Sequence, residues 1–169
     1  MKIVSIFCKN LFAIQYAGED KDEFSRLFAL WNDAEYLEDF FENQKSDLEN
    51  GFWGTISIEN AIIKTFQYAV DFENILLELS EKSNFEQIKG LESIFRPLHD
   101  FQYKIQTLSK SKAKKTWLRL YALRVDSDIY IITGGAIKLT QKMQDRIHTK
   151  HELEKIETCR RFLIEQGIV

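Results

Sequence analysis

Apolar side chains recur along the chain in two different patterns, and each pattern predicts one kind of secondary structure. Residues 3–7 and 11–16 are short runs rich in β-branched and aromatic side chains, which predicts an N-terminal hairpin or one bent strand. Within residues 21–31 the apolar positions recur at i, i+3, i+4 and i+7, the spacing of an amphipathic helix. The same spacing returns over residues 34–44 and again from residue 58 to about residue 81.

Beyond these helices the pattern becomes extended. A capping pair predicts one more short helix at residues 83–90, and Pro97, the only proline, marks the expected boundary between helices and sheet. Apolar and polar positions alternate over residues 117–125, the clearest strand, and residues 129–133 are its expected hairpin partner. Thr149 has the form of an N-cap and is expected to open a final amphipathic helix.

Together these elements predict a single α+β domain over residues 1–169. We expect a twisted, mostly antiparallel sheet with its packed helices on one face. The helical stretch at about residues 55–90 is expected to be an insertion, and residues 95–169 to form a basic hairpin and the C-terminal helix. The pair Gly134 and Gly135 either bends the last strand or lets another part of the molecule approach its backbone.

Charge divides the chain into two unlike halves. Residues 1–98 carry 9 Lys and Arg against 18 Asp and Glu, a net charge of −9, whereas residues 99–169 carry 14 against 8, a net charge of +6. The stretch from residue 101 to residue 125 holds seven cations and no acid. This split predicts a basic face for a phosphate-bearing partner such as RNA. The alternative is that the helices simply place solvated charges on their outer faces.

The motifs of common enzyme classes are absent: there is no phosphate-binding loop, dinucleotide fingerprint, nucleophile elbow or HExxH. Cys8 and Cys159 lie far apart without metal-binding spacing, which predicts free thiols in a reducing, cytoplasmic setting. His148 and His151 straddle the expected helix cap and lack a further ligand, so neither a metal nor a cofactor is expected. No apolar run approaches the roughly 20 residues of a membrane span.

Cations on and after the hairpin are the best candidates for chemistry. Arg119 or Arg124 projects from the first strand, and Lys138 and Lys142 stand four residues apart beyond the second. Binding a phosphodiester needs such cations, and a site that cleaves RNA also uses them to stabilise the charge of the transition state. The alternative interpretation is that the lysines are solvated neighbours of core residues.

Further contacts with RNA are expected from a polar loop and from two aromatic residues that alternation places on the same strand face as Arg119. These candidates are Lys112, Lys114, Lys115, Trp117 and Tyr121. The lysines would contact phosphates, and the two rings would stack on bases. The alternative is that both rings belong to the hydrophobic core.

A family resemblance rests on the segment Ala136-Ile137-Lys138-Leu139-Thr140-Gln141-Lys142, which leads into a helix opened by Glu152-Leu153-Glu154-Lys155. The expected order of strand, helices, strand, hairpin and C-terminal helix resembles the RelE/HigB/ParE-type toxin superfamily, most of all its HigB-like and phage-derived branches. In those branches the last strand often ends in an F-x-K-K-T-x-K type segment. The resemblance covers residues 11–36 loosely and residues 95–162 better.

The chain also departs from that family's pattern. Leu139 stands where the family often has a second lysine, and Ala136 stands where it often has an aromatic residue. Residues 55–90 are additional to the typical toxin, and the chain is acidic overall. The resemblance therefore also allows for a relative that has kept the toxin fold and lost the toxin activity.

The resemblance implies a toxin, or a toxin-derived RNA-binding protein, with RNA or the ribosome and an antitoxin as partners. An active member would be an endoribonuclease that cleaves mRNA without a metal, the RNA 2′-hydroxyl attacking the phosphate. Lys138 and Lys142 would neutralise the phosphate. Arg119 or Arg124 would stabilise the transition state, and Tyr130 or His148 would transfer the protons. The alternative is a non-enzymatic interaction module with an acidic helical face and a basic hairpin face, in which residues 58–79 could form a homodimer.

Overall fold

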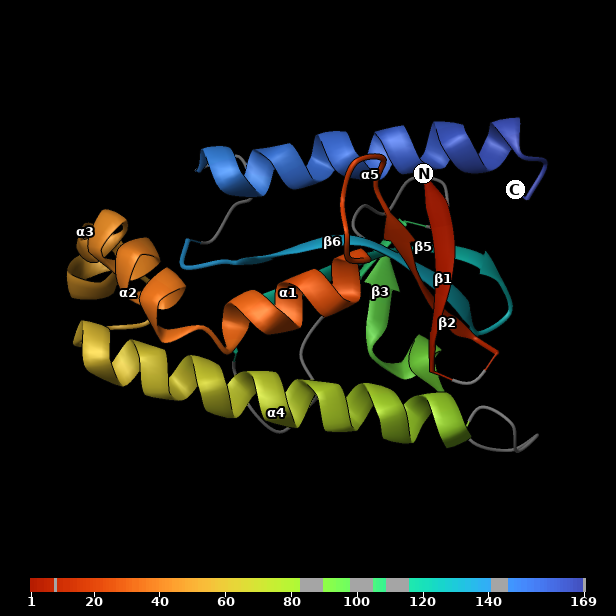
Figure 1. Ribbon diagram of the computed structural model, residues 1–169. Coiled ribbons are helices and arrows are strands. Elements are labelled where there is room, and N and C mark those ends of the chain that lie inside the picture. Colours follow the sequence, from red (N-terminus) through yellow and green to blue (C-terminus); the bar gives the residue numbers. More distant parts are fainter. Residues whose placement is uncertain (8, 83–89, 98–104, 109–115, 141–145, 169) are drawn as a thin grey trace.

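The computed structural model describes residues 1–7, 9–82, 90–97, 105–108, 116–140 and 146–168 (Figure 1). Within these ranges the strands are β1 (Lys2–Phe7), β2 (Leu11–Gln15), β3 (Phe95–Pro97), β4 (Ile105–Leu108), β5 (Leu118–Asp126) and β6 (Ile129–Ile137). The helices are α1 (Glu23–Trp31), α2 (Ala34–Asn43), α3 (Lys45–Asn50), α4 (Ile58–Lys82) and α5 (Ile147–Glu165), with a short 3-10 helix at Leu91–Ser93.

The described strands form one sheet in the order β1-β2-β6-β5-β4-β3. All neighbouring pairs are antiparallel except β2 and β6, which run parallel. The expected α+β fold with a mostly antiparallel sheet is therefore confirmed. The N-terminal runs form a hairpin rather than one bent strand, because β1 pairs with β2 from Lys2 opposite Gln15 to Phe7 opposite Leu11.

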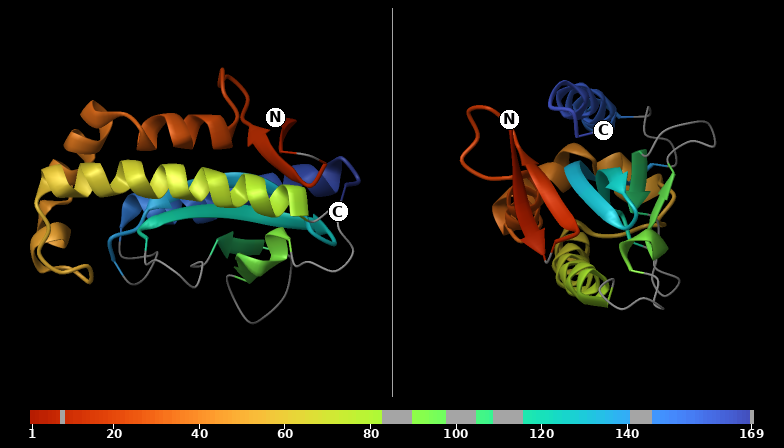
Figure 2. Two further views of the ribbon diagram at one scale, coloured as in Figure 1. Left: turned by 90° about the horizontal axis from the view of Figure 1, so that it is seen from below. Right: turned by 90° about the vertical axis from the view of Figure 1, so that its right-hand side faces the viewer.

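Helices cover both faces of this sheet, which corrects the expectation that they pack on one face. Figures 1 and 2 show α1, α2 and α4 on one side of the sheet and α5 on the other. The reason is that the central strand β5 buries apolar side chains alternately on both sides. Leu118 and Leu120 join the core beneath α4, whereas Tyr121 and Leu123 join the core beneath α5. A sheet that is apolar on both faces needs a helical layer on each.

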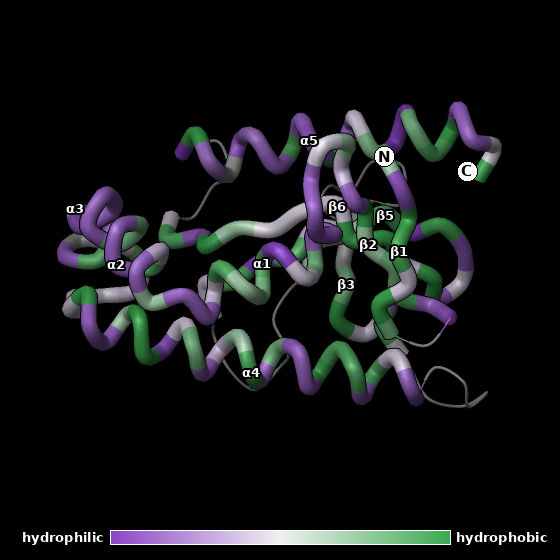
Figure 3. The backbone as a smooth tube through the Cα atoms, in the orientation of Figure 1, coloured by the Kyte–Doolittle hydropathy of each residue, from purple (hydrophilic) through white to green (hydrophobic). Residues whose placement is uncertain are grey.

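The two cores differ in size and in composition. The larger core lies between the sheet and the helices α1, α2 and α4, and it is rich in rings such as Trp31, Phe41 and Trp117. The smaller core lies beneath α5 and is mostly aliphatic, with Ile156 and Leu163 contributed by that helix. Figure 3 shows hydrophobic and hydrophilic stretches alternating along α4 and α5, as amphipathic surface helices require.

The helix boundaries agree with the sequence pattern in part. The helix α4 is continuous over its 25 residues, as its spacing predicts. The short helix expected at residues 83–90 lies outside the described residues, apart from Gly90. The last helix begins at Ile147, with Arg146 as its N-cap, so the expected Thr149 cap is wrong. Glu152, three residues after Thr149, is buried and turned towards Lys155.

Among the described helices, none combines the length and the apolar character that crossing a bilayer requires.

The glycine pair of β6 allows close approach from both faces of the sheet. A Cβ atom on Gly135 would lie 2.5 Å from the carbonyl oxygen of Arg119 and 2.8 Å from Leu27 Cδ1 on α1. A Cβ atom on Gly134 would lie 1.9 Å from Glu152 Oε2 on α5. The structure supports close approach, and the β5–β6 pairing also shifts register beside Gly134, between Tyr121 opposite Gly134 and Ala122 opposite Ile132.

Replacing Gly135 with alanine is therefore expected to lower the free energy of unfolding by about 2–3 kcal/mol, because the new methyl group overlaps a fixed backbone oxygen. The matched control is Gly134→Ala, whose methyl group would come nearest to the ends of the Glu152 and Lys155 side chains rather than to a backbone atom. Urea denaturation of both variants measures the difference. Equal losses in the two variants would show that β6 shifts as a whole and that the packing of α1 on Gly135 is not the constraint.

Candidate functional site

The two arginines proposed for the transition state lie at opposite ends of β5. Arg119 pairs with Ala136, near the end of β6, whereas Arg124 pairs with Tyr130, near its beginning. Five residues of extended strand separate them by roughly 16 Å, at about 3.3 Å per residue. The structure therefore separates two candidates that the sequence could not tell apart.

Arg124 is engaged by groups of its own end of the hairpin. Its Nη2 lies 3.8 Å from Glu92 Oε2, and its Nε donates to the carbonyl oxygen of Asp126 at 3.2 Å. No other proposed site residue that the structure describes, apart from Tyr130, lies at this end. Arg124 is therefore a poor candidate for binding a phosphate together with Lys138.

Arg119 has a different environment. Its half-buried guanidinium donates from Nη1 to the carbonyl oxygens of Thr116, at 2.5 Å, and Leu118, at 2.7 Å. Among the described residues no carboxylate forms an ion pair with it. Burial lowers the pKa of Arg119 below its ordinary value. A partly desolvated cation held only by main-chain carbonyls favours the approach of an anion, which would compensate its charge.

Lys138 lies at the same end of the hairpin as Arg119. Its backbone N–H donates to the carbonyl oxygen of Trp117 at 2.7 Å, and its own carbonyl accepts from Trp53 Nε1 at 3.3 Å. These bonds fix the backbone of Lys138 two residues beyond Ala136, the partner of Arg119. The four other proposed lysines, Lys112, Lys114, Lys115 and Lys142, lie outside the described residues.

The N-terminus of α5 lies beside Lys138. His148 Nε2 is 3.0 Å from the carbonyl oxygen of Ile137, and its ring packs edge-on against Phe40, with centroids 5.3 Å apart. Arg146 binds Asp47 through its Nε, 2.9 Å from Oδ2. A hollow of about 500 Å³ is lined, in the described part of the chain, by Gln44, Arg146, Ile147, His148 and His151. Because α5 begins at Ile147, both histidines lie inside the helix rather than on either side of its N-cap.

The two residues proposed for proton transfer are placed very differently. His148 is half-buried beside the hollow and next to Lys138 in space. Tyr130 is fully buried at the other end of the hairpin and stacks on Phe95 with ring centroids 4.6 Å apart. Burial raises the pKa of Tyr130 to about 12. Tyr130 is therefore a poor candidate for proton transfer, because its ring is buried and lies at the end of the hairpin away from Arg119 and Lys138.

Trp117 and Tyr121 belong to the core, which corrects their expected stacking on bases. Their exposed fractions are 0% and 1%, so neither ring offers a face to a nucleotide. Trp117 also lies on the α4 side of the sheet rather than with Tyr121, and its Nε1 donates to Thr65 Oγ1 at 3.0 Å. The alternation that grouped them fails because β5 begins only at Leu118.

A buried ion network that the sequence did not reveal lies next to the glycine pair. Glu23, at the start of α1, accepts from Arg26 Nε and Nη2 at 2.8 and 2.9 Å. Lys155 from α5 donates to Glu23 Oε2 at 2.5 Å and lies 3.4 Å from Glu152 Oε1. Glu23 is only 2% exposed and Glu152 only 7%. The network joins the helices of the two opposite layers past the edge of β6.

Tyr16 extends this network along β6. Its hydroxyl donates to the carbonyl oxygen of Thr133 at 2.7 Å and lies 3.0 Å from Cys159 Sγ, while Lys155 Nζ stands 5.1 Å above its ring. Burial raises the pKa of the Cys159 thiol to about 11, so the thiol stays protonated and unreactive at neutral pH. Cys159 is free, as expected, and Cys8 lies outside the described residues.

Two buried polar atoms near the network find no hydrogen-bond partner among the described residues: Glu152 Oε2 and the hydroxyl of Tyr121. Burial is the main reason that the pKa of Glu152 is raised, and the charge of Glu23 acts in the same direction, against the attraction of Lys155. The pairing of Lys155 with Glu23 spans 132 residues, so no local spacing could have indicated it. In the sequence, the pair Gly134 and Gly135 was the signal that pointed to this region, because it predicted that another part of the molecule approaches the backbone of β6.

In the described part of the chain no cluster of His, Cys, Asp and Glu side chains is able to hold a metal ion. No family model matches the chain, and neither a curated protein nor a solved structure matches it.

Proposed function

We propose that the chain is a RelE/HigB-like toxin or a toxin-derived RNA-binding protein that binds an RNA phosphate at the open end of the β5–β6 hairpin. The observation that carries the proposal is the state of Arg119. Its half-buried guanidinium has only main-chain carbonyl partners among the described residues, and Lys138 and His148 lie at the same strand end.

Electrostatics supports this placement. Taking part of a guanidinium out of water costs free energy that carbonyl dipoles offset only partly, and an anion completes the compensation. A phosphate matches the planar fork of an arginine, because two parallel N–H groups meet two oxygens. The positive end of the α5 macrodipole stands beside Ile137 and adds to the attraction.

The order of elements supports the same reading. The chain runs from two strands through helices, two further strands and the β5–β6 hairpin to a C-terminal helix. The resemblance rests on the simpler order of strand, helices, strand, hairpin and C-terminal helix, which this order contains with one additional strand before the helices and one before the hairpin. The helix α4 occupies most of the stretch expected to be additional to the typical toxin. Residues 99–169 carry a net charge of +6, and the hairpin lies within them.

For an active enzyme, the proposal assigns named roles at this end of the hairpin. The RNA 2′-hydroxyl attacks the adjacent phosphate, the P–O5′ bond breaks and a 2′,3′-cyclic phosphate forms. His148 is the group placed to take the proton of the 2′-hydroxyl or to give one to the departing 5′-oxygen. Arg119 and Lys138 stabilise the charge that develops on the phosphate oxygens, and Lys142 is assigned to the same task. A binding protein without cleavage would use the same cations and no proton transfer.

The expected result is that Arg119→Gln and Lys138→Ala each weaken binding of a single-stranded RNA oligonucleotide about tenfold. Fluorescence anisotropy at several salt concentrations measures the affinity. Each variant should also reduce the slope of log affinity against log salt by about one, to a similar extent for every RNA sequence, because one phosphate contact is lost. Growth after controlled induction in a bacterial host tests toxicity with the same proteins.

The matched control is Arg124→Ala, which removes an arginine from the same strand at the other end of the hairpin. It should leave RNA affinity and growth arrest unchanged. Incubation of labelled RNA with the wild type separates cleavage from binding. RNA affinity that is equal in the wild type and in both test variants would reject the proposed site and favour the non-enzymatic interaction module.

A further inference from the structure

The outer side of α4 carries an apolar stripe that is not part of the core. Ile63, Val70 and Leu77 are 47%, 53% and 38% exposed, although all three are large aliphatic residues. They are seven residues apart, which places them in one row along a helix, as in the seam of a coiled coil.

The stripe is distinct from the face by which α4 packs against the molecule. The residues of α4 that are buried are Ala61, Thr65, Ala69, Phe72, Leu76 and Ser80. At about 100° per residue, the centre of this buried row lies on the far side of the helix from Val70. The helix therefore has two apolar rows, of which the described part of the chain covers only one.

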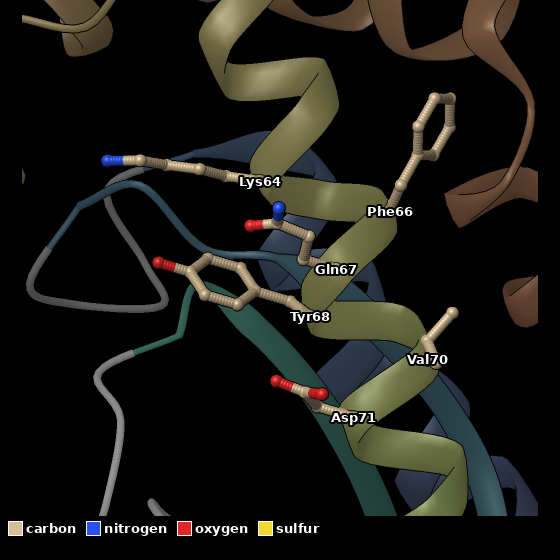
Figure 4. Close-up of a pocket in the computed structure, with 6 residues that line it drawn as sticks. All are labelled: Lys64, Phe66, Gln67, Tyr68, Val70 and Asp71. Carbon is tan, nitrogen blue, oxygen red and sulfur yellow. The ribbon is translucent and has the colours of Figure 1, made fainter.

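Figure 4 shows how the middle of α4 presents its side chains. Phe66 and Val70 project from one side of the helix. The polar groups project from the other side: Lys64, Gln67, Tyr68 and Asp71. Phe66 is half-buried and lies between Ile63 and Val70, where it packs partly against the larger core at the border of the stripe. In the left view of Figure 2, α4 lies in front of the other elements along its whole length.

Acidic residues border this stripe. The helix holds five acids, Glu59, Asp71, Glu73, Glu78 and Glu81, against two lysines, Lys64 and Lys82. One of these lysines, Lys82, already pairs with Glu78 one turn earlier. Glu59 lies one turn before Ile63, Glu73 one turn before Leu77 and Glu81 one turn after it. Acids thus lie near both ends of the apolar row, Glu59 at one end and Glu73 and Glu81 at the other.

From this combination we infer that the outer face of α4 docks an amphipathic helix of a partner protein, with aliphatic residues in its contact row and Lys or Arg beside them. Its aliphatic row packs on Ile63, Val70 and Leu77, and its cations meet the acidic border.

A second copy of the chain fits this surface less well than a basic helix. In an antiparallel pair of α4 helices centred on Val70, Glu59 of one copy faces Glu81 of the other at both ends. Acids opposite acids oppose the pairing, as like charges at coiled-coil flanks do. A partner helix of opposite charge has no such conflict.

The docking surface is separate from the proposed RNA site. The helix α4 lies on the opposite side of the sheet from α5, whose N-terminus stands beside Lys138 (Figure 1). A substitution on the outer face of α4 should therefore leave RNA binding unchanged, and a substitution at Arg119 or Lys138 should leave peptide binding unchanged.

The test uses the full chain and two synthetic helical peptides as probes. Both peptides carry Leu or Ile in a heptad contact row, and they differ only in their flanking positions, which hold Lys in one and Glu in the other. Fluorescence anisotropy should show the Lys peptide binding at least about tenfold more tightly than the Glu peptide. The double variant Val70→Asn with Leu77→Asn should weaken binding of the Lys peptide about tenfold or more.

The control variant is Ile164→Asn, which changes an equally exposed aliphatic residue on α5, 48% exposed, and should leave peptide binding unchanged. Thermal melting checks that every variant is folded, which is expected because the altered side chains are exposed. Equal binding of the two peptides, or full binding by the double variant, would overturn the inference. Self-association of the wild type that the double variant loses would overturn it too, by identifying the stripe as a homodimer face.

Discussion

Replacing Trp117 with alanine is expected to lower the free energy of unfolding by about 3–5 kcal/mol, the cost of emptying a large buried aromatic site. The indole is 0% exposed and lies edge-on to Phe41, Trp53 and Tyr68, with ring centroids 5.2–6.0 Å apart. The substitution also leaves the hydroxyl of Thr65 without the donor that Trp117 supplies. Urea denaturation followed by far-UV circular dichroism gives the free energy.

Two further variants separate the parts of this loss. Trp117→Phe keeps most of the ring contacts but removes the N–H, and should cost clearly less than the alanine variant. Tyr121→Phe removes a buried hydroxyl that has no partner among the described residues, and is expected to leave stability unchanged or slightly higher. An alanine variant at Trp117 that stays stable but no longer binds RNA would contradict the core assignment and restore the stacking role.

The sequence predicts the fold correctly where the apolar periodicity is strong. The prediction fails where the position of a single residue determines which face of the sheet it joins. The spacing within α4 and the alternation within β5 predicted a helix and a strand in the right places. Trp117 was assigned to the wrong face because it precedes the first residue of β5, and a shift of one position in a strand reverses its side. The expectation of a single helical layer was wrong. Whether both faces of the sheet are buried depends on contacts between residues that are distant in sequence, and the local pattern does not show these contacts.

The candidate site was predictable in type but not in arrangement. Clustered cations on a hairpin indicated an anion partner, yet the choice between Arg119 and Arg124 depends on strand register and on what each arginine meets. Arg124 meets Glu92 across the fold, which no local pattern shows. Lys155 and Glu23 each resemble an ordinary solvated charge of an amphipathic helix. Their contact arises only when α1 and α5 are placed at the edge of β6.

Two charge-neutralising substitutions in the buried ion network are expected to act in opposite directions. Glu23→Gln should lower the free energy of unfolding by about 3 kcal/mol, because Arg26 and Lys155 then lose their common anionic partner. Glu152→Gln should raise it by about 1 kcal/mol at neutral pH, because a buried carboxylate with one unpartnered oxygen is replaced by a neutral group. The two variants change the same functional group within one network, so each serves as the control of the other.

The pH dependence of stability distinguishes this explanation from a simple change in packing. The pKa of Glu152 is raised in the folded protein above the ordinary value of 4.5, so the folded state binds this proton more tightly than the unfolded state does. The contribution of Glu152 to the free energy of unfolding of the wild type therefore falls as the pH rises from about 4.5 through the folded-state pKa, and the loss is complete above it. Glu152→Gln has no such proton to lose, so the stability difference between variant and wild type should open across this window and then stay constant. Urea denaturation at intervals between about pH 4 and pH 8 measures it. A constant difference at every pH would mean that the gain comes from packing, and that the carboxylate of Glu152 is already compensated by Lys155 in the folded chain.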